Sequence, residues 1–349
     1  MENKISKGEL LEELLRNYFL NLGYYVVRGV KFRYEENDIT DVDLFLYDRS
    51  STLSRERINV DIKNKKQPQA FERILWANGL KKLLGFDKCI VATTDSRPII
   101  QKFGLIHDTI VLDGNFISKL KSNNLTNRLT EDEFLLKLAK HKSYKKFPNK
   151  DWRFLYENSK SKLLNELDYS GFNSNLFLLQ YLFETIITDV QKREDATRLA
   201  YIVISHLLIM MDFILKDITF LEANKKNEHL RDGLNYGNLG KDGVDEIINI
   251  AVALSGKSRN YYNDSFNSSQ YLILSEFFSK NEILRGVFNW AKTFEQFAFN
   301  SEFTSPNMLD SVCKAIISVF LDYFSIDRTV FFTASYEIQG KLPLSDNGE

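Results

Sequence analysis

The sequence has little cysteine and histidine and no long uninterrupted apolar run. Its 349 residues include only two cysteines, Cys89 and Cys313, and four histidines. This scarcity excludes a disulfide framework and a Cys/His zinc cluster, and it fits a reducing cytoplasm. The most apolar stretch, residues 200–215, is interrupted by polar residues such as Asp212. We therefore predict a buried helix there, no membrane association and a cytoplasmic location.

The chain also lacks a strong net charge, which is -1 overall. Residues 1–125 carry 20 Lys/Arg against 17 Asp/Glu, and the remainder carries 26 against 30. The asymmetry is concentrated in residues 63–82, where six Lys/Arg accompany a single acid. Such a run predicts a basic surface that can meet a phosphate backbone.

The length favours two domains, which we place at residues 1–125 and 126–349. Apolar periodicity in the first part predicts a helix, three strands forming an antiparallel meander, a helix, a strand, a short helix and a final strand. In chain order these elements cover residues 9–22, 24–32, 41–47, 57–63, 70–85, 88–94, 98–104 and 107–113. We expect an α+β protein whose N-terminal α/β core has a central mixed sheet flanked by helices.

Strand patterns end after Phe116, and the second domain, residues 126–349, is predicted to be mainly α-helical. Thr130 and Glu133 have the spacing of a capping box at the start of a helix. Helical periodicity then covers residues 152–167, 176–191, 196–215, 245–254, 271–299 with a break, and 308–324. No chemistry can be assigned to this domain, which we expect to serve in recognition, partner binding or oligomerisation.

The chemistry is predicted to centre on two strands of the first domain. The tripeptide Asp61-Ile62-Lys63 has little specificity alone, because composition predicts roughly six acid-x-Lys/Arg matches by chance. Its position is more informative, since Asp61 and Lys63 are two residues apart on a strand and share a face. Asp43 lies on the preceding strand.

Two carboxylates on adjacent strands suit a hard divalent cation. Mg²⁺, or Mn²⁺ in its place, prefers oxygen ligands and can promote hydrolysis of a phosphodiester. We expect Asp43, Asp61 and the backbone carbonyl of Ile62 to supply those ligands. Lys63 would orient the attacking water or stabilise the developing negative charge.

Several segments of the first third follow one another in an informative order: an acidic helix, GYYVV, TDVDLFLY, VDIKNKK and a basic helix. In this order the region resembles the PD-(D/E)XK nuclease superfamily, and it is most similar to restriction-endonuclease-like and Holliday-junction-resolvase-like members. The resemblance implies that Asp43, Asp61 and Lys63 bind metal and activate water, with help from a glutamate of the first helix. One departure is Val42, which stands where many members have proline.

Two choices among acids stay open. For the glutamate of the first helix, Glu12 lies on the apolar, inward-facing arc and Glu13 aligns with polar residues. We therefore favour Glu12 as a catalytic and metal-binding acid. Asp41 shares a strand face with Asp43 and is the second candidate for the acid of that strand.

The basic run supplies the candidate nucleic-acid contacts. Glutamines at the start of the second helix are placed near substrate in the family that this region resembles, and the Lys and Arg side chains can bind phosphates. We predict contacts from Lys65, Lys66, Gln67, Gln69 and Arg73. Trp76, on the same helix, is expected to pack in the core.

These observations predict a Mg²⁺-dependent DNA endonuclease. By analogy with the family, its role is restriction or defence against foreign DNA, with processing of branched DNA as a second option. DNA is the expected partner, and the helical part is expected to bind a second copy of the chain or another protein of a defence system. The competing hypothesis is an inactive nuclease fold kept as a DNA- or partner-binding module in a larger assembly.

Overall fold

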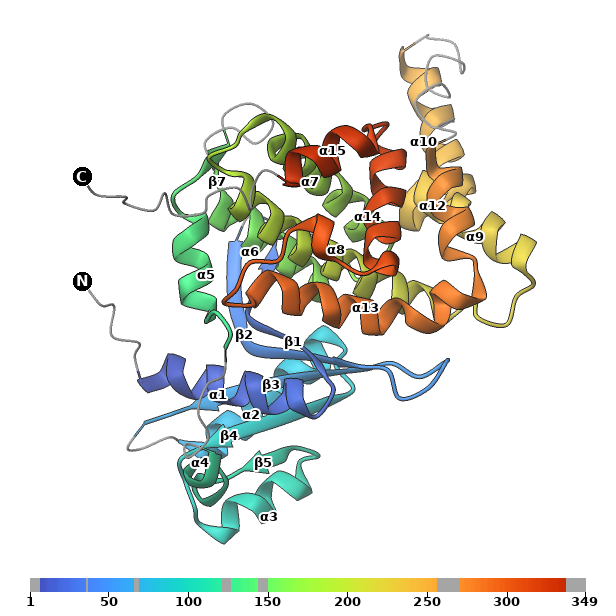
Figure 1. Ribbon diagram of the computed structural model, residues 1–349. Helices are drawn as coiled ribbons and strands as arrows, with labels where there is room; N and C mark the ends of the chain where they lie inside the picture. Colours follow the sequence, from blue (N-terminus) through green and yellow to red (C-terminus); the bar gives the residue numbers. More distant parts are fainter. Residues whose placement is uncertain are drawn as a thin grey trace, which may run out of the picture. The chain divides into compact units, whose positions relative to one another are not determined.

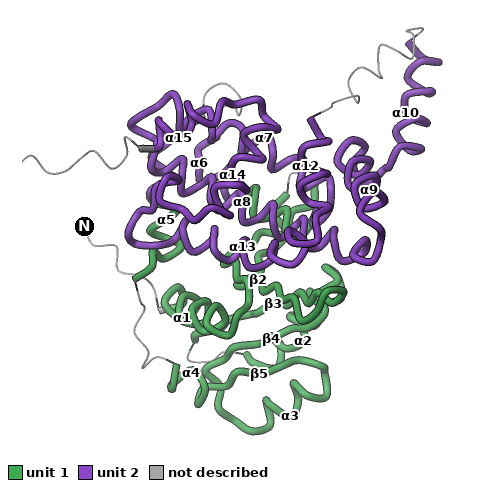
Figure 2. Tube along the Cα trace, turned by 45° about the vertical axis from the view of Figure 1, so that its right-hand side comes forward, with its two compact units in different colours: residues 1–136, 157–165 green, residues 137–156, 166–349 purple. Residues whose placement is uncertain are grey.

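The computed structural model describes residues 7–35, 37–65, 69–120, 127–143, 150–255 and 270–336. The chain forms two compact units (Figure 2). Unit 1 comprises residues 1–136 and 157–165, and unit 2 comprises residues 137–156 and 166–349. This division differs from the expected boundary at residue 125, because residues 127–136 and 157–165 make ionic contacts with the N-terminal elements, as described below.

Unit 1 contains a five-stranded sheet with helices on both faces (Figure 1). Its elements are α1 (Lys7–Asn21), β1 (Tyr25–Tyr34), β2 (Asn37–Asp48), β3 (Glu56–Lys63), α2 (Ala70–Leu84), β4 (Lys88–Thr93), α3 (Pro98–Ile106), β5 (Ile110–Leu112) and α4 (Gly114–Leu120). Helices α5 (Glu131–Leu138) and α6 (Trp152–Asn165) each contribute part of their length to this unit. The predicted order of elements is therefore confirmed.

The sheet is mixed, with strand order β1-β2-β3-β4-β5. Strands β1, β2 and β3 pair antiparallel, which confirms the predicted meander, and β3, β4 and β5 pair parallel. On one face, apolar side chains of α1 and α4 pack against alternate residues of the strands. On the other face, α2 and α3 cover a second set that includes Cys89 and Val91. Alternation along each strand thus decides which face a residue meets.

Local sequence explains which face of α2 is buried and why the helix ends at Leu84. Its buried residues Ala70, Ile74, Ala77 and Leu80 recur at helical spacing and form the face toward the sheet. Gly85 ends the helix at φ 64°, a left-handed conformation in which glycine avoids the strain of a Cβ. The run of predicted contacts between residues 65 and 73 therefore spans the loop after β3 and the first turn of this helix.

The last strand is shorter than predicted. The pattern from residues 107 to 113 suggested a strand, but β5 covers only Ile110–Leu112. The three residues before it form a turn in which Asp108 has a φ of +48° and the Thr109 hydroxyl donates to the His107 carbonyl. The backbone N–H groups of this turn donate to carbonyls of α3, and the His107 carbonyl also accepts from the Asn78 side chain of α2, so these groups do not join the ladder.

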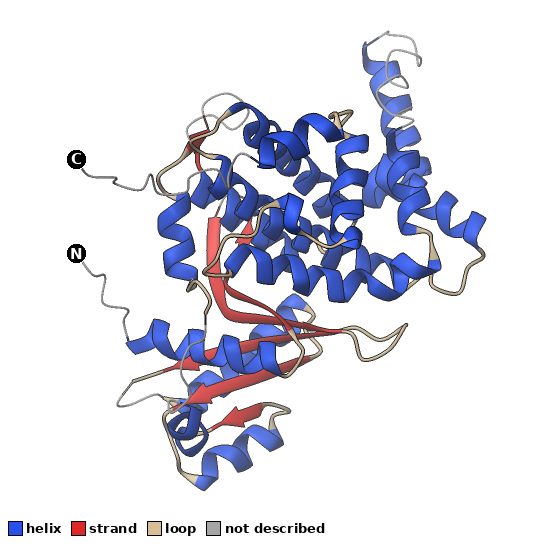
Figure 3. Cartoon of the chain, viewed as in Figure 1, coloured by secondary structure: helices blue, strands red, loops and turns tan. Residues whose placement is uncertain are grey.

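Unit 2 is almost entirely helical, as Figure 3 shows by its colours. Besides the two-residue strands β6 (Lys142–Ser143) and β7 (Lys150–Asp151), its elements are α7 (Tyr169–Thr188), α8 (Arg193–Leu215), α9 (Ala223–Tyr236), η1 (Gly237–Leu239), α10 (Gly240–Ser255), α12 (Gln270–Phe278), α13 (Asn281–Phe299), η2 (Pro306–Met308), α14 (Ser311–Tyr323) and α15 (Arg328–Tyr336). The expected break between residues 271 and 299 falls at Ser279–Lys280. Helices α9 and α15 were not predicted.

Helix α8 is the core of unit 2. It is long and apolar enough to cross a bilayer by composition, but 94% of its apolar window is buried inside the structure. Every residue from Ala196 to Asp212 is buried. Burial on all sides is the environment of a core helix, in agreement with the predicted buried helix.

Candidate metal and nucleic-acid site

The candidate site lies where β2 and β3 separate. Their antiparallel ladder ends at the pair Leu44 and Val60, although the next position would set Asp43 opposite Asp61. Instead, the Asp43 carboxylate accepts a hydrogen bond of 2.6 Å from the Ile62 N–H. A carboxylate thus replaces a backbone carbonyl as the partner of that N–H, and the space between the strands is lined by acids.

The backbone of Ile62 also contributes to this space. In an extended strand the N–H and C=O of one residue point toward the same neighbour. Because the Ile62 N–H points to Asp43, its carbonyl oxygen is turned toward β2 as well. The predicted ligand atoms of Asp43 and Ile62 are therefore on the same side of β3.

Asp61 is buried, with 6% of its surface exposed, and is held by an arginine. The Arg73 Nε donates to one carboxylate oxygen at 2.8 Å, and a terminal guanidinium nitrogen donates to the other. Asp61 therefore points to the face of the sheet that α2 covers. Arg73 was predicted to contact a phosphate, but in the structure it binds Asp61, a candidate metal ligand.

Burial and opposing charges set the protonation of Asp43. Burial raises the pKa of Asp43, and the negative charge of Asp41 raises it further. The Ile62 hydrogen bond and the positive charges of Lys63 and Arg73 act in the opposite direction. Lys63, half-buried at the end of β3, is therefore close enough to act on the Asp43 carboxylate, as its predicted role requires.

The two candidate acids of β2 differ in their surroundings. Asp41 is exposed, and Asp43 is half-buried with its carboxylate on the backbone of β3. The structure thus separates two residues that strand alternation alone left equivalent. Of the two, only Asp43 contacts β3 through a hydrogen bond in the described structure.

Glu12, on α1, is engaged by Arg28. Its carboxylate accepts from the Arg28 Nε at 2.6 Å. Burial raises the pKa of Glu12, Arg28 opposes that effect, and the negative charges of Asp43 and Glu13 add to it. Glu12 is therefore electrostatically coupled to Asp43, while its role as a ligand stays a prediction.

The prediction that Glu13 faces away from the interior was wrong. Only 2% of its surface is exposed, and its carboxylate accepts from Arg28 at 3.1 Å and from the Glu131 N–H at 2.8 Å. The polar arc of α1 is covered by the start of α5, which lies outside the expected first domain. Glu13 and Arg16, on the polar arc of α1, are therefore buried as well.

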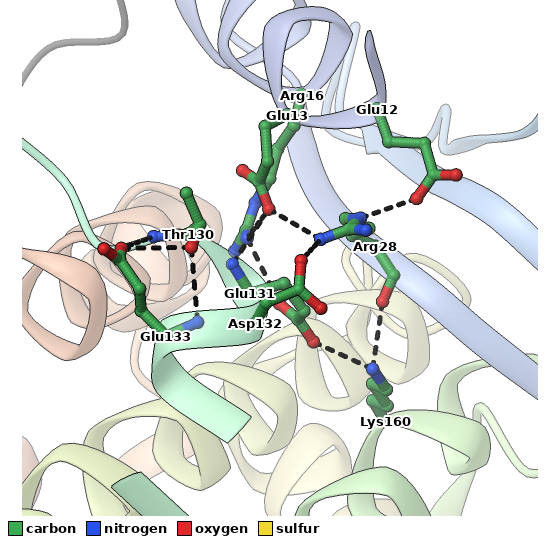
Figure 4. Close-up of polar contacts among 9 residues, drawn as sticks. All are labelled: Glu12, Glu13, Arg16, Arg28, Thr130, Glu131, Asp132, Glu133 and Lys160. Atoms are coloured by element: carbon green, nitrogen blue, oxygen red, sulfur yellow. Dashed lines mark hydrogen bonds and ion pairs between the residues drawn. The ribbon is translucent and has the colours of Figure 1, made fainter. Parts of the chain in front are cut away.

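Figure 4 shows that Glu12 and Glu13 belong to a larger buried network. Arg28 joins both glutamates to Asp132 of α5, which it contacts at 2.7 Å. Glu131, also of α5, binds Arg16 at 3.1 Å and Lys160 of α6 at 2.8 Å. These partners were not identified from the sequence, where the only related signal was the capping box.

That capping box is confirmed. The Thr130 N–H donates to the Glu133 carboxylate at 2.8 Å, and the Glu133 N–H donates to the Thr130 hydroxyl at 3.2 Å. It fixes the first turn of α5, and this turn carries Glu131 and Asp132. A local motif thus positions the residues that complete the network around α1.

The predicted nucleic-acid contacts are only partly brought together. Lys65 and Gln69 are exposed on either side of the loop before α2, while Lys66 and Gln67 lie outside the described residues. Gln69 has a φ of 50° at the residue preceding α2. Arg73 is engaged by Asp61, so its phosphate-binding role requires that this ion pair open.

Trp76 is exposed, contrary to the expectation that it packs in the core. The exposed fraction is 45%, and the Arg73 guanidinium lies 5.9 Å from the centre of its ring. The helix turns this position outward because Ile74, Ala77 and Leu80 already form the face toward the sheet. An exposed aromatic ring beside a guanidinium is a surface on which a base or an arginine can stack.

The donor set suits a divalent cation of the Mg²⁺ class. Two carboxylates and a carbonyl offer oxygen ligands, and Mg²⁺ usually keeps several waters besides one or two carboxylates. Within the described part of the chain, no three His, Cys, Asp or Glu side chains are grouped closely enough to hold a metal by themselves. The role of Asp43, Asp61 and the Ile62 carbonyl as ligands therefore stays a prediction.

Comparison of the chain with protein-family models, with curated proteins and with solved structures found no match.

Proposed function

We propose that unit 1 is a Mg²⁺-dependent nuclease of the PD-(D/E)XK type and that the chain cuts phosphodiester bonds within DNA. The observation that carries this proposal is the opening of the β2–β3 ladder at Asp43 and Asp61. Asp43 binds the β3 backbone there, and Lys63 acts on its charge. Acids and a lysine placed on central strands are costly unless they are paired or serve a function, and among the described residues only Asp61 of these two acids has a cationic partner, Arg73.

Each residue has a chemical role in this proposal. Asp43, Asp61 and the Ile62 carbonyl would hold Mg²⁺ or Mn²⁺, which supplies positive charge against the phosphate and activates water. The Ile62 N–H orients the Asp43 carboxylate. Lys63 donates hydrogen bonds to a phosphate oxygen and stabilises the negative charge that develops on it.

The biological role follows by analogy. Restriction or defence against foreign DNA is the role that the resemblance implies, with branched-DNA processing as the second enzymatic option. A cytoplasmic location fits the two free cysteines, both of which are buried. Unit 2 would recognise substrate, a second copy of the chain or a defence-system partner.

Cleavage assays on the full chain test the proposal. Supercoiled, linear, single-stranded and branched DNA are incubated with Mg²⁺, Mn²⁺ or EDTA. Asp43→Asn keeps an oxygen that can accept from the Ile62 N–H, so it removes charge while preserving the fold. We expect Asp43→Asn, Asp61→Asn and Lys63→Gln to lower cleavage by at least about a hundredfold.

A matched control and one further variant complete the design. Lys102→Gln removes an exposed lysine from α3 and should cleave like the wild type. Asp41→Asn should retain activity if Asp43 is the functional acid of β2. Metal-dependent cleavage that persists in both Asp43→Asn and Asp61→Asn rejects the proposal.

The Asp61–Arg73 ion pair favours one alternative, an inactive nuclease fold that binds DNA or a protein partner. A permanent guanidinium on Asp61 would leave the site without a free ligand. In that case the wild-type chain binds DNA without cutting it, and Asp43→Asn binds DNA as the wild type does and does not cut it either.

A further inference from the structure

Two predicted roles conflict at Arg73. The guanidinium contacts both oxygens of Asp61, a carboxylate that the proposed nuclease needs for a divalent cation. The positive charges of an arginine and a divalent ion on one carboxylate repel each other. Both cannot be bound tightly at once, so occupation by the ion requires that Arg73 move.

The surroundings of Arg73 allow such a movement. It lies in the first turn of α2, and 20% of its side chain is exposed, against 7% for Asp61. The exposed ring of Trp76 lies beside the guanidinium on the same helix. A released Arg73 can therefore lie over an aromatic surface facing solvent, where its planar fork can bind a phosphate.

We propose that Arg73 is an exchangeable counter-ion of the candidate metal site: its guanidinium neutralises Asp61 until a divalent cation binds, and it then contacts a phosphate of the nucleic acid. This inference rests on the proposed function, since it takes Asp61 to be a metal ligand. In this order of binding, the divalent cation binds Asp61 first, and the released Arg73 then contacts a phosphate.

Metal binding is measured without catalysis, by calorimetric titration of the full chain with Ca²⁺. Arg73→Gln removes the competing charge and should bind Ca²⁺ on the order of tenfold more tightly, because a hydrogen-bonded charge no longer has to be displaced. Arg73→Lys, which keeps the charge but loses the two-pronged contact, should fall between wild type and Arg73→Gln. Asp61→Asn should lose Ca²⁺ binding.

Arg97 offers a matched control in the same unit. It also binds an aspartate through two nitrogens, Asp95, and it lies over an aromatic ring of α2 at 5.7 Å. Arg97→Gln should leave Ca²⁺ affinity unchanged. A rise in affinity confined to Arg73→Gln therefore reports the loss of competition at Asp61 rather than a general change in charge.

A second measurement follows the released guanidinium. Binding of a duplex oligonucleotide is titrated against salt in Ca²⁺ and in EDTA. In Ca²⁺ the logarithmic salt slope of wild type should exceed that of Arg73→Gln by about one, the contribution of one phosphate contact. In EDTA, where Asp61 holds Arg73, the two slopes should agree.

The outcomes separate this inference from the proposed function. If Asp61→Asn loses Ca²⁺ but Arg73→Gln binds it no more tightly than wild type, the counter-ion role is overturned and the metal site stands. If neither wild type nor Arg73→Gln binds Ca²⁺, the metal site and the inference are both rejected. Circular dichroism of each variant checks that the fold is retained.

Discussion

Arg28 is the residue whose loss should most disturb unit 1. It joins Glu12 and Glu13 of α1 to Asp132 of α5, and its own side chain is only 7% exposed. Arg28→Met fills a similar volume but removes the charge. The variant leaves the Glu13 carboxylate, 3% exposed, and the Glu12 carboxylate, 23% exposed, without their shared cation.

The magnitude follows from these exposures. Breaking a buried pair by removing one partner costs about 3 to 5 kcal/mol when the remaining charge has no other partner. Glu13 keeps Arg16 at 3.7 Å and the N–H of Glu131, so the cost here should be smaller. The contact with Asp132 adds at most about 1 kcal/mol, since 38% of that side chain is exposed and water screens it. We therefore expect the free energy of unfolding of unit 1 to fall by about 2 to 4 kcal/mol, between the cost of a lost charged hydrogen bond and that of an uncompensated buried charge.

Hydrogen exchange of the amides in β1, β2 and β3 measures this change within unit 1. Arg33→Met is the matched control on the same strand, where the partner Asp38 has 48% of its side chain exposed, and it should cost at most about 1 kcal/mol. Adding Glu13→Gln to Arg28→Met should recover part of the loss, because one uncompensated charge disappears. A cost for Arg28→Met no larger than that of Arg33→Met would refute the reasoning.

Two further predictions concern local structure. Asp310 caps α14, and hydrogen bonds from the N–H groups of Cys313 and Val312 lower its pKa. Its carboxylate therefore stabilises the fold at pH values above its unfolded pKa, and this stabilisation is lost as the pH falls through the folded pKa. In urea titrations Asp310→Ala should cost about 1 kcal/mol at pH 7, and the difference from wild type should shrink below about pH 4. Gly79→Ala should stabilise α2 by about 0.5 to 1 kcal/mol, because a Cβ there meets nothing within 4 Å. Gly104→Ala should instead lower the melting temperature, because its Cβ would lie 2.5 Å from a methyl carbon of Val111. Equal effects of the two substitutions would contradict the packing of α3 against β5.

Elements with a clear apolar period could be predicted from the sequence. Helix α1, the strand meander and α2 were predicted correctly because each buries one face, and the apolar residues of that face recur at the spacing of a helix or a strand. Helix α9 was missed because few of its positions are buried: Lys226, Leu230, Gly233 and Leu234. A mostly polar helix gives periodicity little to detect.

The candidate site was partly predictable for the same reason. Asp43 and Asp61 lie on neighbouring strands of a meander, so a short-range pattern was enough to bring them together. The charged network was not predictable, because Arg28 and Asp132 are 104 residues apart and Glu13 and Glu131 are 118 apart. Apolar periodicity reports which face of α1 meets the sheet, but it cannot report that α5 covers the other.

The charge of the connected cluster gives a physical reason for a divalent cation. Seven carboxylates in or beside this cluster belong to Glu12, Glu13, Asp41, Asp43, Asp61, Glu131 and Asp132, and five cations belong to Arg16, Arg28, Lys63, Arg73 and Lys160. Among these described residues the carboxylates outnumber the cations by two. Burial raises the pKa of Glu12 and of Asp43, and it outweighs the opposing effects of Arg28 on Glu12 and of the Ile62 hydrogen bond on Asp43. A single divalent ion at Asp43 would supply the missing charge, and its binding should therefore release any protons that these acids hold.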